Sequence, residues 1–243
     1  MTVQIHCPIS GGMSIGNFNI TGLSLLLVAA LLPAWMPGAH ARPADSLFVF
    51  ECDQARFGTW YMPGKDRMEF YTPDTSYALR RAVSASGARY VNEAEQIEFW
   101  NKGDKAMISI KARKFTNCTT DAREISWFRA RLQGVDFRAV GQEPGWMVEI
   151  REQQHTGELL LDYGTRQLQL RNVERVEKGR PPDTVLFKAH TDSARVSIRA
   201  VREECRDPMN GNRSSYTATV TIQGKAYRGC GRFLNAAAID PNK

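Results

Sequence analysis

Charge is absent from the first 41 of the 243 residues, which contain no Lys, Arg, Asp or Glu. A mostly apolar run extends from Gly22 to Leu32 within them and is too short to span a bilayer comfortably. The small-x-small pattern Ala39-His40-Ala41 follows it, and this order of segments is typical of a secretory signal. We therefore expect a signal peptide over residues 1–41, export to the periplasm, and no stable membrane insertion of the mature chain.

The basic residues that usually begin a signal peptide are also missing, since this segment offers only His6. Two alternatives therefore stay open besides an atypical signal, namely a start at Met13 and an uncleaved N-terminal anchor. A lipoprotein anchor is not expected, because no cysteine follows Ala41.

Metal-binding spacings are missing from the mature chain as well. Its four cysteines are Cys52, Cys118, Cys205 and Cys230. They form no CxxC pair, and the mature histidines His155 and His190 lie near none of them in the sequence, so we expect no metal and no cofactor. An even cysteine count in an exported chain favours two disulfides, and four cysteines allow three pairings that their spacing does not distinguish.

A strong charge of one sign is also lacking. The net charge of +6 arises from 14 basic and 12 acidic residues over 42–130, and from 18 and 14 over 131–243. A nucleic-acid binder concentrates basic residues on one face. The densest basic run, from Lys111 to Lys114, is expected to lie on a solvated hairpin, and we predict no nucleic-acid partner.

Short segments rich in alternating, β-branched or aromatic residues recur about every ten residues, without helical periodicity. The predicted strands are 47–51, 59–62, 68–71, 77–83, 97–100 and 106–110, and then 146–151, 158–161, 166–170, 184–189, 194–201 and 216–223. Residues 177–183 and 206–212 are predicted loops. The fold class is therefore all-β, with a small antiparallel β-barrel over 42–130, a junction near 120–134, and a second β-rich domain over 131–243 that begins near Phe137.

Three motifs follow one another in the first block: SASGARY at 84–90, FWNKGD at 99–104 and NC at 117–118, after a first cysteine in FVFEC at 48–52. Over about residues 46–120 this order resembles the periplasmic and membrane-bound inhibitors of c-type lysozyme. The resemblance implies a small antiparallel barrel with one disulfide, Cys52–Cys118, and c-type lysozyme as the partner. One disulfide in each block then pairs Cys205 with Cys230.

The resemblance also implies that Ser86 and Lys102 enter the lysozyme cleft. Such a cleft presents two carboxyl groups, one of them ionised, so it can accept a charge-assisted bond from an ammonium group. A hydroxyl can donate to one carboxyl group and accept from a protonated one. Gly87 and Gly103 are expected to adopt positive φ angles, so that each turn projects its neighbouring side chain.

Supporting roles are expected for Arg89, which would brace the loop, and for Tyr90, which would line the contact, although a structural role stays open for both. Lys105 lies outside the motifs and is expected to contribute little. The connection over 91–98 is about two residues longer than is usual in this family, and an even-numbered extension keeps the side chains on the same faces of the hairpin. Each motif alone would fit an ordinary turn, so the prediction depends on their order.

The second block carries FRAVGQEPGW at 137–146, DYG at 162–164, RDPMNG at 206–211 and RGCGRF at 228–233. These motifs resemble an uncharacterised domain of bacterial envelope proteins, and that resemblance implies no activity. No nucleophile accompanies His155, Glu158 and Asp162, so we predict no enzyme. The alternative to an inhibitor is a periplasmic β-barrel protein that binds a ligand or maintains the envelope; the sequence predicts no oligomeric state.

Overall fold

The computed structural model describes residues 46–62, 64–179 and 182–234. The predicted signal peptide and its cleavage site lie outside these residues. Within the described part of the chain, none of the helices has the length and apolar character needed to cross a membrane.

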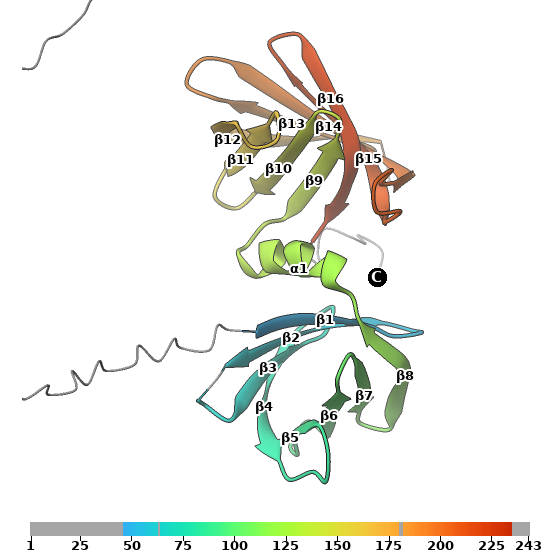
Figure 1. Cartoon of the computed structure of the whole chain (residues 1–243). Coiled ribbons are helices and arrows are strands. Elements are labelled where there is room, and N and C mark those ends of the chain that lie inside the picture. The colour runs from blue at the N-terminus through green and yellow to red at the C-terminus, as the bar shows by residue number, and fades with distance from the viewer. Residues whose placement is uncertain (1–45, 63, 180–181, 235–243) are drawn as a thin grey trace, which may run out of the picture. The chain divides into compact units, whose positions relative to one another are not determined.

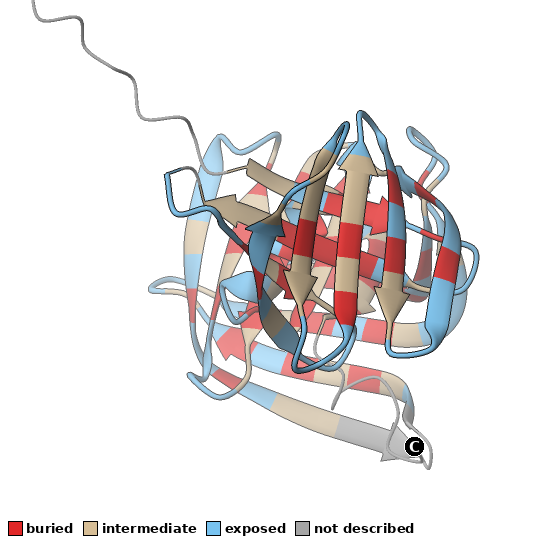
Figure 2. Cartoon of the chain, turned by 90° about the horizontal axis from the view of Figure 1, so that it is seen from below, coloured by how far each residue is buried: buried red, intermediate tan, exposed pale blue. Residues whose placement is uncertain are grey.

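The first eight strands form a closed antiparallel barrel in sequence order (Figure 1). They are β1 (Ser46–Glu51), β2 (Arg56–Met62), β3 (Arg67–Tyr71), β4 (Ser76–Ala82), β5 (Ala88–Asn92), β6 (Ile97–Lys102), β7 (Lys105–Ile110) and β8 (Arg113–Thr120). The barrel closes where the last strand pairs with the first, with Phe50 opposite Thr120. Buried and more exposed residues alternate along its strands, as expected for side chains that point in turn into and out of a barrel (Figure 2).

A short helical segment follows the first barrel and was not predicted from the sequence. It consists of the 3-10 turn η1 (Ala122–Glu124) and the helix α1 (Ile125–Leu132). Eight residues are too few for helical periodicity to stand out in a sequence pattern. The predicted domain boundary, between residues 130 and 131, lies inside α1.

The second eight strands form another closed antiparallel barrel. They are β9 (Phe137–Gln142), β10 (Gly145–Arg151), β11 (Thr156–Leu161), β12 (Arg166–Gly179), β13 (Pro182–His190), β14 (Arg195–Arg206), β15 (Arg213–Ile222) and β16 (Lys225–Phe233). The last strand pairs with β9 and closes the barrel. The all-β prediction with two β-rich regions is therefore confirmed.

The loop predicted over 177–183 is wrong at both of its ends, because β12 extends to Gly179 and β13 begins at Pro182. The pairing of these strands extends to Gly179 opposite Pro182, two of the residues that suggested a loop. The loop predicted over 206–212 is confirmed apart from its first residue, since β14 ends at Arg206 and β15 begins at Arg213.

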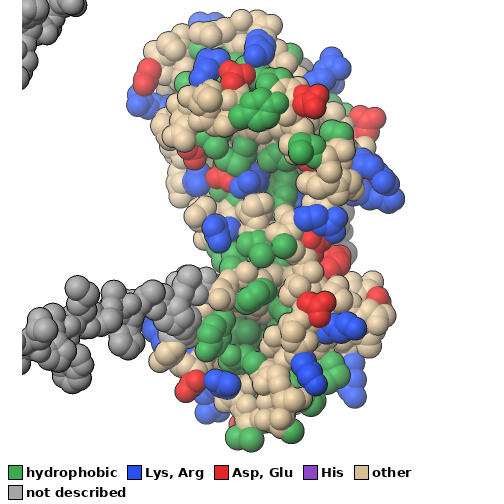
Figure 3. Space-filling model, viewed as in Figure 1, with side chains coloured by type: hydrophobic (Ala, Val, Ile, Leu, Met, Phe, Trp, Pro, Cys, Tyr) green, Lys and Arg blue, Asp and Glu red, His purple; other side chains and the backbone are tan. Residues whose placement is uncertain are grey.

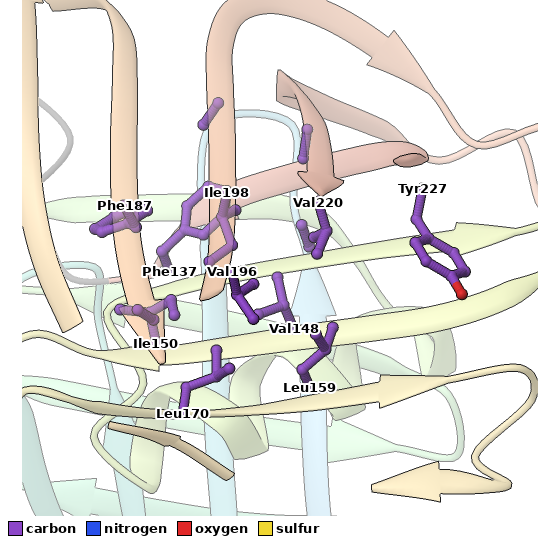
Figure 4. Packing of buried hydrophobic residues seen from close by; sticks show 14 of the residues in the cluster. Phe137, Val148, Ile150, Leu159, Leu170, Phe187, Val196, Ile198, Val220 and Tyr227 are labelled. Atoms are coloured by element: carbon purple, nitrogen blue, oxygen red, sulfur yellow. The ribbon is translucent and has the colours of Figure 1, made fainter. Parts of the chain in front are cut away.

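Each barrel has its own core. Phenylalanines dominate the first, where the Phe57 ring lies 4.7 Å from that of Phe115 and Phe50 lies 5.1 Å from Phe99, both edge to face. Aliphatic side chains from successive strands fill the second, among them Val148, Ile150, Leu159 and Ile198, together with the Phe187 ring (Figure 4).

One disulfide lies in each barrel, as predicted. Cys52–Cys118 joins residues 66 apart in the sequence, next to the point where β8 meets β1. Cys205–Cys230 joins residues 25 apart and connects β14 to β16. These are the pairings that the resemblance and the one-per-block argument gave.

A buried carboxylate links η1 to a strand of each barrel. Glu124 is only 5% exposed. Its Oε2 accepts from Arg56 Nη1 of β2 at 2.8 Å, and its two oxygens accept from Arg232 Nη1 and Nη2 of β16, each at 2.9 Å. Fork-like pairing to a guanidinium compensates the cost of burying this charge.

Candidate functional site

The motif residues lie in two turns at one end of the first barrel. Successive hairpin turns of an up-and-down barrel alternate between its ends, so the β4–β5 and β6–β7 turns share an end. The strands between them are in register, with Ala88 opposite Asn101 and Lys102 opposite Lys105. This pairing brings the segment around Ser86 next to the end of β6.

The β4–β5 turn is fixed by hydrogen bonds to its backbone. Ser84 Oγ donates to the Gly87 carbonyl at 3.2 Å, and Trp100 Nε1 donates to the Ser86 carbonyl at 2.8 Å. Gly87 has a φ of +70°, and a Cβ built there would lie 2.2 Å from the Asn101 carbonyl oxygen. Glycine is therefore required both for its conformation and for the close approach of the two strands.

The β6–β7 turn projects Lys102 into solvent. Gly103 has a φ of +63° and occupies the first central position of a two-residue hairpin loop, where a type II′ turn favours glycine. A Cβ at this position would meet nothing within 4 Å, so glycine is needed here for its φ alone. The positive φ angles expected for Gly87 and Gly103 are confirmed.

Ser86 and Lys102 line a single hollow of about 550 Å³. The other side chains around it include Trp100, Lys105, Met107 and Asn117. Two lysines and no carboxylate contribute to its lining, so the hollow presents positive charge next to the exposed thioether of Met107. Charges elsewhere are mixed in sign, as the face in Figure 3 shows.

Lys105 and Asn117 also line the hollow, although neither was predicted from the sequence to do so. Lys105 pairs directly with Lys102 across the turn and lies in the same hollow. A Lys105 variant is therefore unsuitable as a control for Lys102. Asn117 has a φ of +54° and its Nδ2 donates to Asp53 Oδ2 at 2.7 Å. The signals were present, because Lys105 follows a two-residue turn and Asn117 belongs to the NC motif.

Arg89 and Tyr90 do not line the hollow. Arg89 Nε donates to Glu98 Oε1 at 2.6 Å across β5 and β6, and this hydrogen bond and the charge of Glu98 raise the pKa of Arg89. Tyr90 is 4% exposed and packs in the core, with its ring 6.1 Å from that of Tyr61. Burial raises the pKa of Tyr90 above its ordinary value. The position of Tyr90 fits a structural role in the core, the alternative that the sequence left open.

The longer connection over 91–98 does not displace the motif residues. Residues 93–96 form its turn, at the opposite end of the barrel from Lys102. Pairing continues without a bulge from Asn92 opposite Ile97 to Ala88 opposite Asn101. An even-numbered extension leaves the pleat unchanged, so the side chains of β6 keep their alternation up to Lys102.

Comparison with known proteins identifies a family for part of the chain. The sequence model of the family described as membrane-bound lysozyme-inhibitor of c-type lysozyme matches residues 50–116. No curated protein and no solved structure matches the chain. The matched residues include Ser86 and Lys102 and end within β8, the strand that precedes η1. The resemblance of the first barrel to the c-type lysozyme inhibitors is therefore confirmed over residues 50–116.

Proposed function

We propose that this protein is an exported inhibitor of c-type lysozyme that inserts Ser86 and Lys102 into the active-site cleft of the enzyme. The family match over residues 50–116 supports a role in lysozyme inhibition in general. The observation that carries the finer proposal is that Ser86 and Lys102, which belong to different turns, line one hollow at the same end of the first barrel.

The chemistry of the two groups suits a cleft with two carboxyl groups. The Lys102 ammonium donates to the ionised carboxylate, and exclusion of water strengthens this charge-assisted bond. The Ser86 hydroxyl donates to one carboxyl group or accepts from the protonated one. Gly87 and the Trp100–Ser86 hydrogen bond hold the β4–β5 turn in shape before binding, which reduces the entropy lost on association.

A lysis assay with c-type lysozyme and the purified protein tests this mechanism. Lys102→Ala is expected to raise the inhibition constant by about 30-fold to several thousand-fold, since truncating one partner of a buried charge pair costs on the order of 2 to 5 kcal/mol. Ser86→Ala loses only hydroxyl bonds to charged groups and is expected to cost tens of fold, roughly 1.5 to 3 kcal/mol. The double variant should be non-additive, because both side chains act in one cleft.

Lys114→Ala is the matched control, because Lys114 is exposed on β8 near the opposite end of the barrel and does not line the hollow. It should change inhibition by less than about twofold, as isolated surface charges contribute little. Every variant must unfold at the temperature of the original protein. The cleft mechanism is wrong if Lys102→Ala and Lys114→Ala inhibit equally well.

The alternative is a ligand-binding or envelope-maintenance protein without inhibitory activity. A folded chain that leaves lysis unaffected would favour it.

For the periplasmic location, mass spectrometry of the envelope fraction should find a mature chain that begins at Arg42; a chain retaining Met1 or Met13 would indicate an anchored protein.

A further inference from the structure

The four motifs of the second barrel, which inhibition does not use, come together around two adjoining hollows. The larger has a volume of about 470 Å³ and the smaller about 330 Å³, and they share Gln142, Asp207 and Cys230 in their walls. Residues from 137–146, 162–164, 206–211 and 228–233 all contribute to the larger one. Its volume falls within the range of small-molecule sites.

The wall formed by the β14–β15 loop is fixed in place. Cys205–Cys230 ties the start of this loop to β16. Asp207 is 5% exposed, and its carboxylate accepts from Gln142 Nε2 of β9 at 2.8 Å and from the Met209 amide at 2.8 Å. A loop held by a disulfide and a buried carboxylate forms a preorganised surface, which lowers the entropic cost of binding.

Two aromatic residues of the larger hollow are seated against glycines. A Cβ at Gly141 would lie 2.0 Å from Trp146 Nε1, and a Cβ at Gly145 would lie 2.6 Å from Tyr163 Cδ1. Trp146 Nε1 also donates to the Arg228 carbonyl at 3.1 Å. The two glycines of the FRAVGQEPGW motif are therefore required by packing, since any larger residue would displace these rings.

Tyr163 lies in the hairpin turn between β11 and β12, with its backbone in the left-handed conformation that such turns use. Its φ is +59°, and that of Asp162 is +51°, a backbone conformation that bulky L-residues rarely adopt. The Tyr163 side chain is 73% exposed, although one part of its ring packs against Gly145. The turn therefore holds an exposed aromatic ring at the wall of the larger hollow.

The charges around the larger hollow already have partners. Its charged lining residues are Arg123, Arg138 and Asp207. Arg138 pairs with Glu149, Arg123 pairs with Asp121 at 2.9 Å, and Asp207 accepts from Gln142. An ionic ligand would compete with these partners, whereas a neutral ligand would not. The hollow therefore offers aromatic rings, side-chain amides and a hydroxyl group, while its charges are compensated. This combination suits a ligand that has both apolar faces and many hydroxyl groups.

We propose that this hollow binds a neutral oligosaccharide. The C–H face of a pyranose ring packs on Tyr163, and the side chains of Asn210, Asn212 and Ser214 exchange hydrogen bonds with the ring hydroxyls. A peptide is disfavoured, because both barrels are closed and offer no free strand edge to which a peptide could add.

Titration calorimetry of the full chain, without lysozyme, tests the proposal with two probes, the β-1,4-linked N-acetylglucosamine tetramer and cellotetraose. Saturable binding of at least one is expected. Tyr163→Ala should weaken it about tenfold, while Tyr163→Phe keeps the ring and should change it less than about threefold. Asn212→Ala should weaken it about tenfold through lost hydrogen bonds. Lys102→Ala, on the other barrel, should leave it unchanged.

Binding of the N-acetylglucosamine tetramer alone would assign the site to acetylated cell-wall-type chains, and binding of both would assign it to pyranose chains in general. The proposal is overturned if neither tetramer binds the folded chain, or if binding survives both Tyr163→Ala and Asn212→Ala. These outcomes do not depend on lysozyme inhibition, which Tyr163→Ala should leave intact.

Discussion

The two barrels share an architecture but place their candidate binding surfaces differently. Each has eight antiparallel strands in sequence order and one disulfide. The hollow of the first barrel lies at the end that carries the β4–β5 and β6–β7 turns, around Ser86 and Lys102. The hollows of the second lie where the β14–β15 loop is fixed to β9 and β16. The same fold therefore presents two kinds of candidate site, and these differ in their turns and loops.

The cores of the barrels also differ, which has consequences for stability. The first core contains 13 buried residues and the second 21 among those that the structure describes. The disulfide of the first barrel closes the longer loop, 66 residues against 25. The first barrel therefore combines less hydrophobic burial with a larger contribution from its cross-link.

Removing the disulfides gives the largest expected effect and tests this difference directly. Replacing Cys52 and Cys118 by Ser should lower the free energy of unfolding of the first barrel by about 4 kcal/mol, and the same change at Cys205 and Cys230 should cost the second about 3.5 kcal/mol. Because the first core is smaller, the first barrel should lose the larger share of its stability.

Hydrogen exchange resolved by peptide measures this difference. Exchange should become much faster throughout β1–β8 in the Cys52 and Cys118 variant, and the increase in β9–β16 of the Cys205 and Cys230 variant should be smaller. The comparison fails if the Cys205 and Cys230 variant opens its barrel more than the Cys52 and Cys118 variant opens the other.

The second prediction concerns the buried carboxylate of Glu124, which pairs with an arginine of each barrel. Glu124→Gln removes the charge that pairs with Arg56 and Arg232, and should destabilise the protein by about 3 kcal/mol, since it leaves the buried guanidinium of Arg232 uncompensated, whereas Arg56 keeps its partner Glu51. Glu51→Gln is the matched control, because the Glu51–Arg56 pair is exposed and should contribute less than about 1 kcal/mol. Thermal unfolding measures both variants; equal shifts would show that Glu124 has no special role.

A third prediction concerns the first hollow alone and corrects the expectation for Lys105. Because Lys105 lies opposite Lys102 in the same hollow, Lys105→Ala should weaken lysozyme inhibition about fivefold, equivalent to about 1 kcal/mol. Asn212→Ala, in the second barrel, should not change inhibition. Lysis assays would contradict this if Lys105→Ala matched Lys114→Ala.

The sequence predicted most strands, both disulfides and the all-β class, but it did not predict β5, β8, β9 and β16. These strands contain residues that are depleted in sheets, such as Gly229 and Gly231 in β16 and Asn117 in β8. Pairing with a neighbour on each side supplies what local propensity lacks.

The order of the motifs indicated Ser86 and Lys102, but their common hollow depends on the register between β5 and β6, which a list of motifs does not contain. Tyr90 could not be placed from the sequence either, since its side of the strand is set by that same register. Asp207 was missed because its partner Gln142 lies 65 residues away.

The smallest expected effect is an alkaline loss of stability in the first barrel. Burial, and then the neighbouring Tyr61, raise the pKa of Tyr90 above its ordinary value. The unfolded chain therefore ionises this residue first, near pH 10. The contribution of the neutral phenol is fully present below that pH and is lost as the pH rises through the raised folded pKa.

Tyr90→Phe keeps the ring but removes the ionisable group, so it should reduce the fall in unfolding free energy above about pH 10, measured by urea unfolding at several pH values. Between about pH 7 and 9, where the phenol is neutral in both states, the variant should differ only by the hydroxyl contact with Tyr61, about 1 kcal/mol. An unchanged alkaline fall in the variant would mean that a group other than Tyr90 causes it.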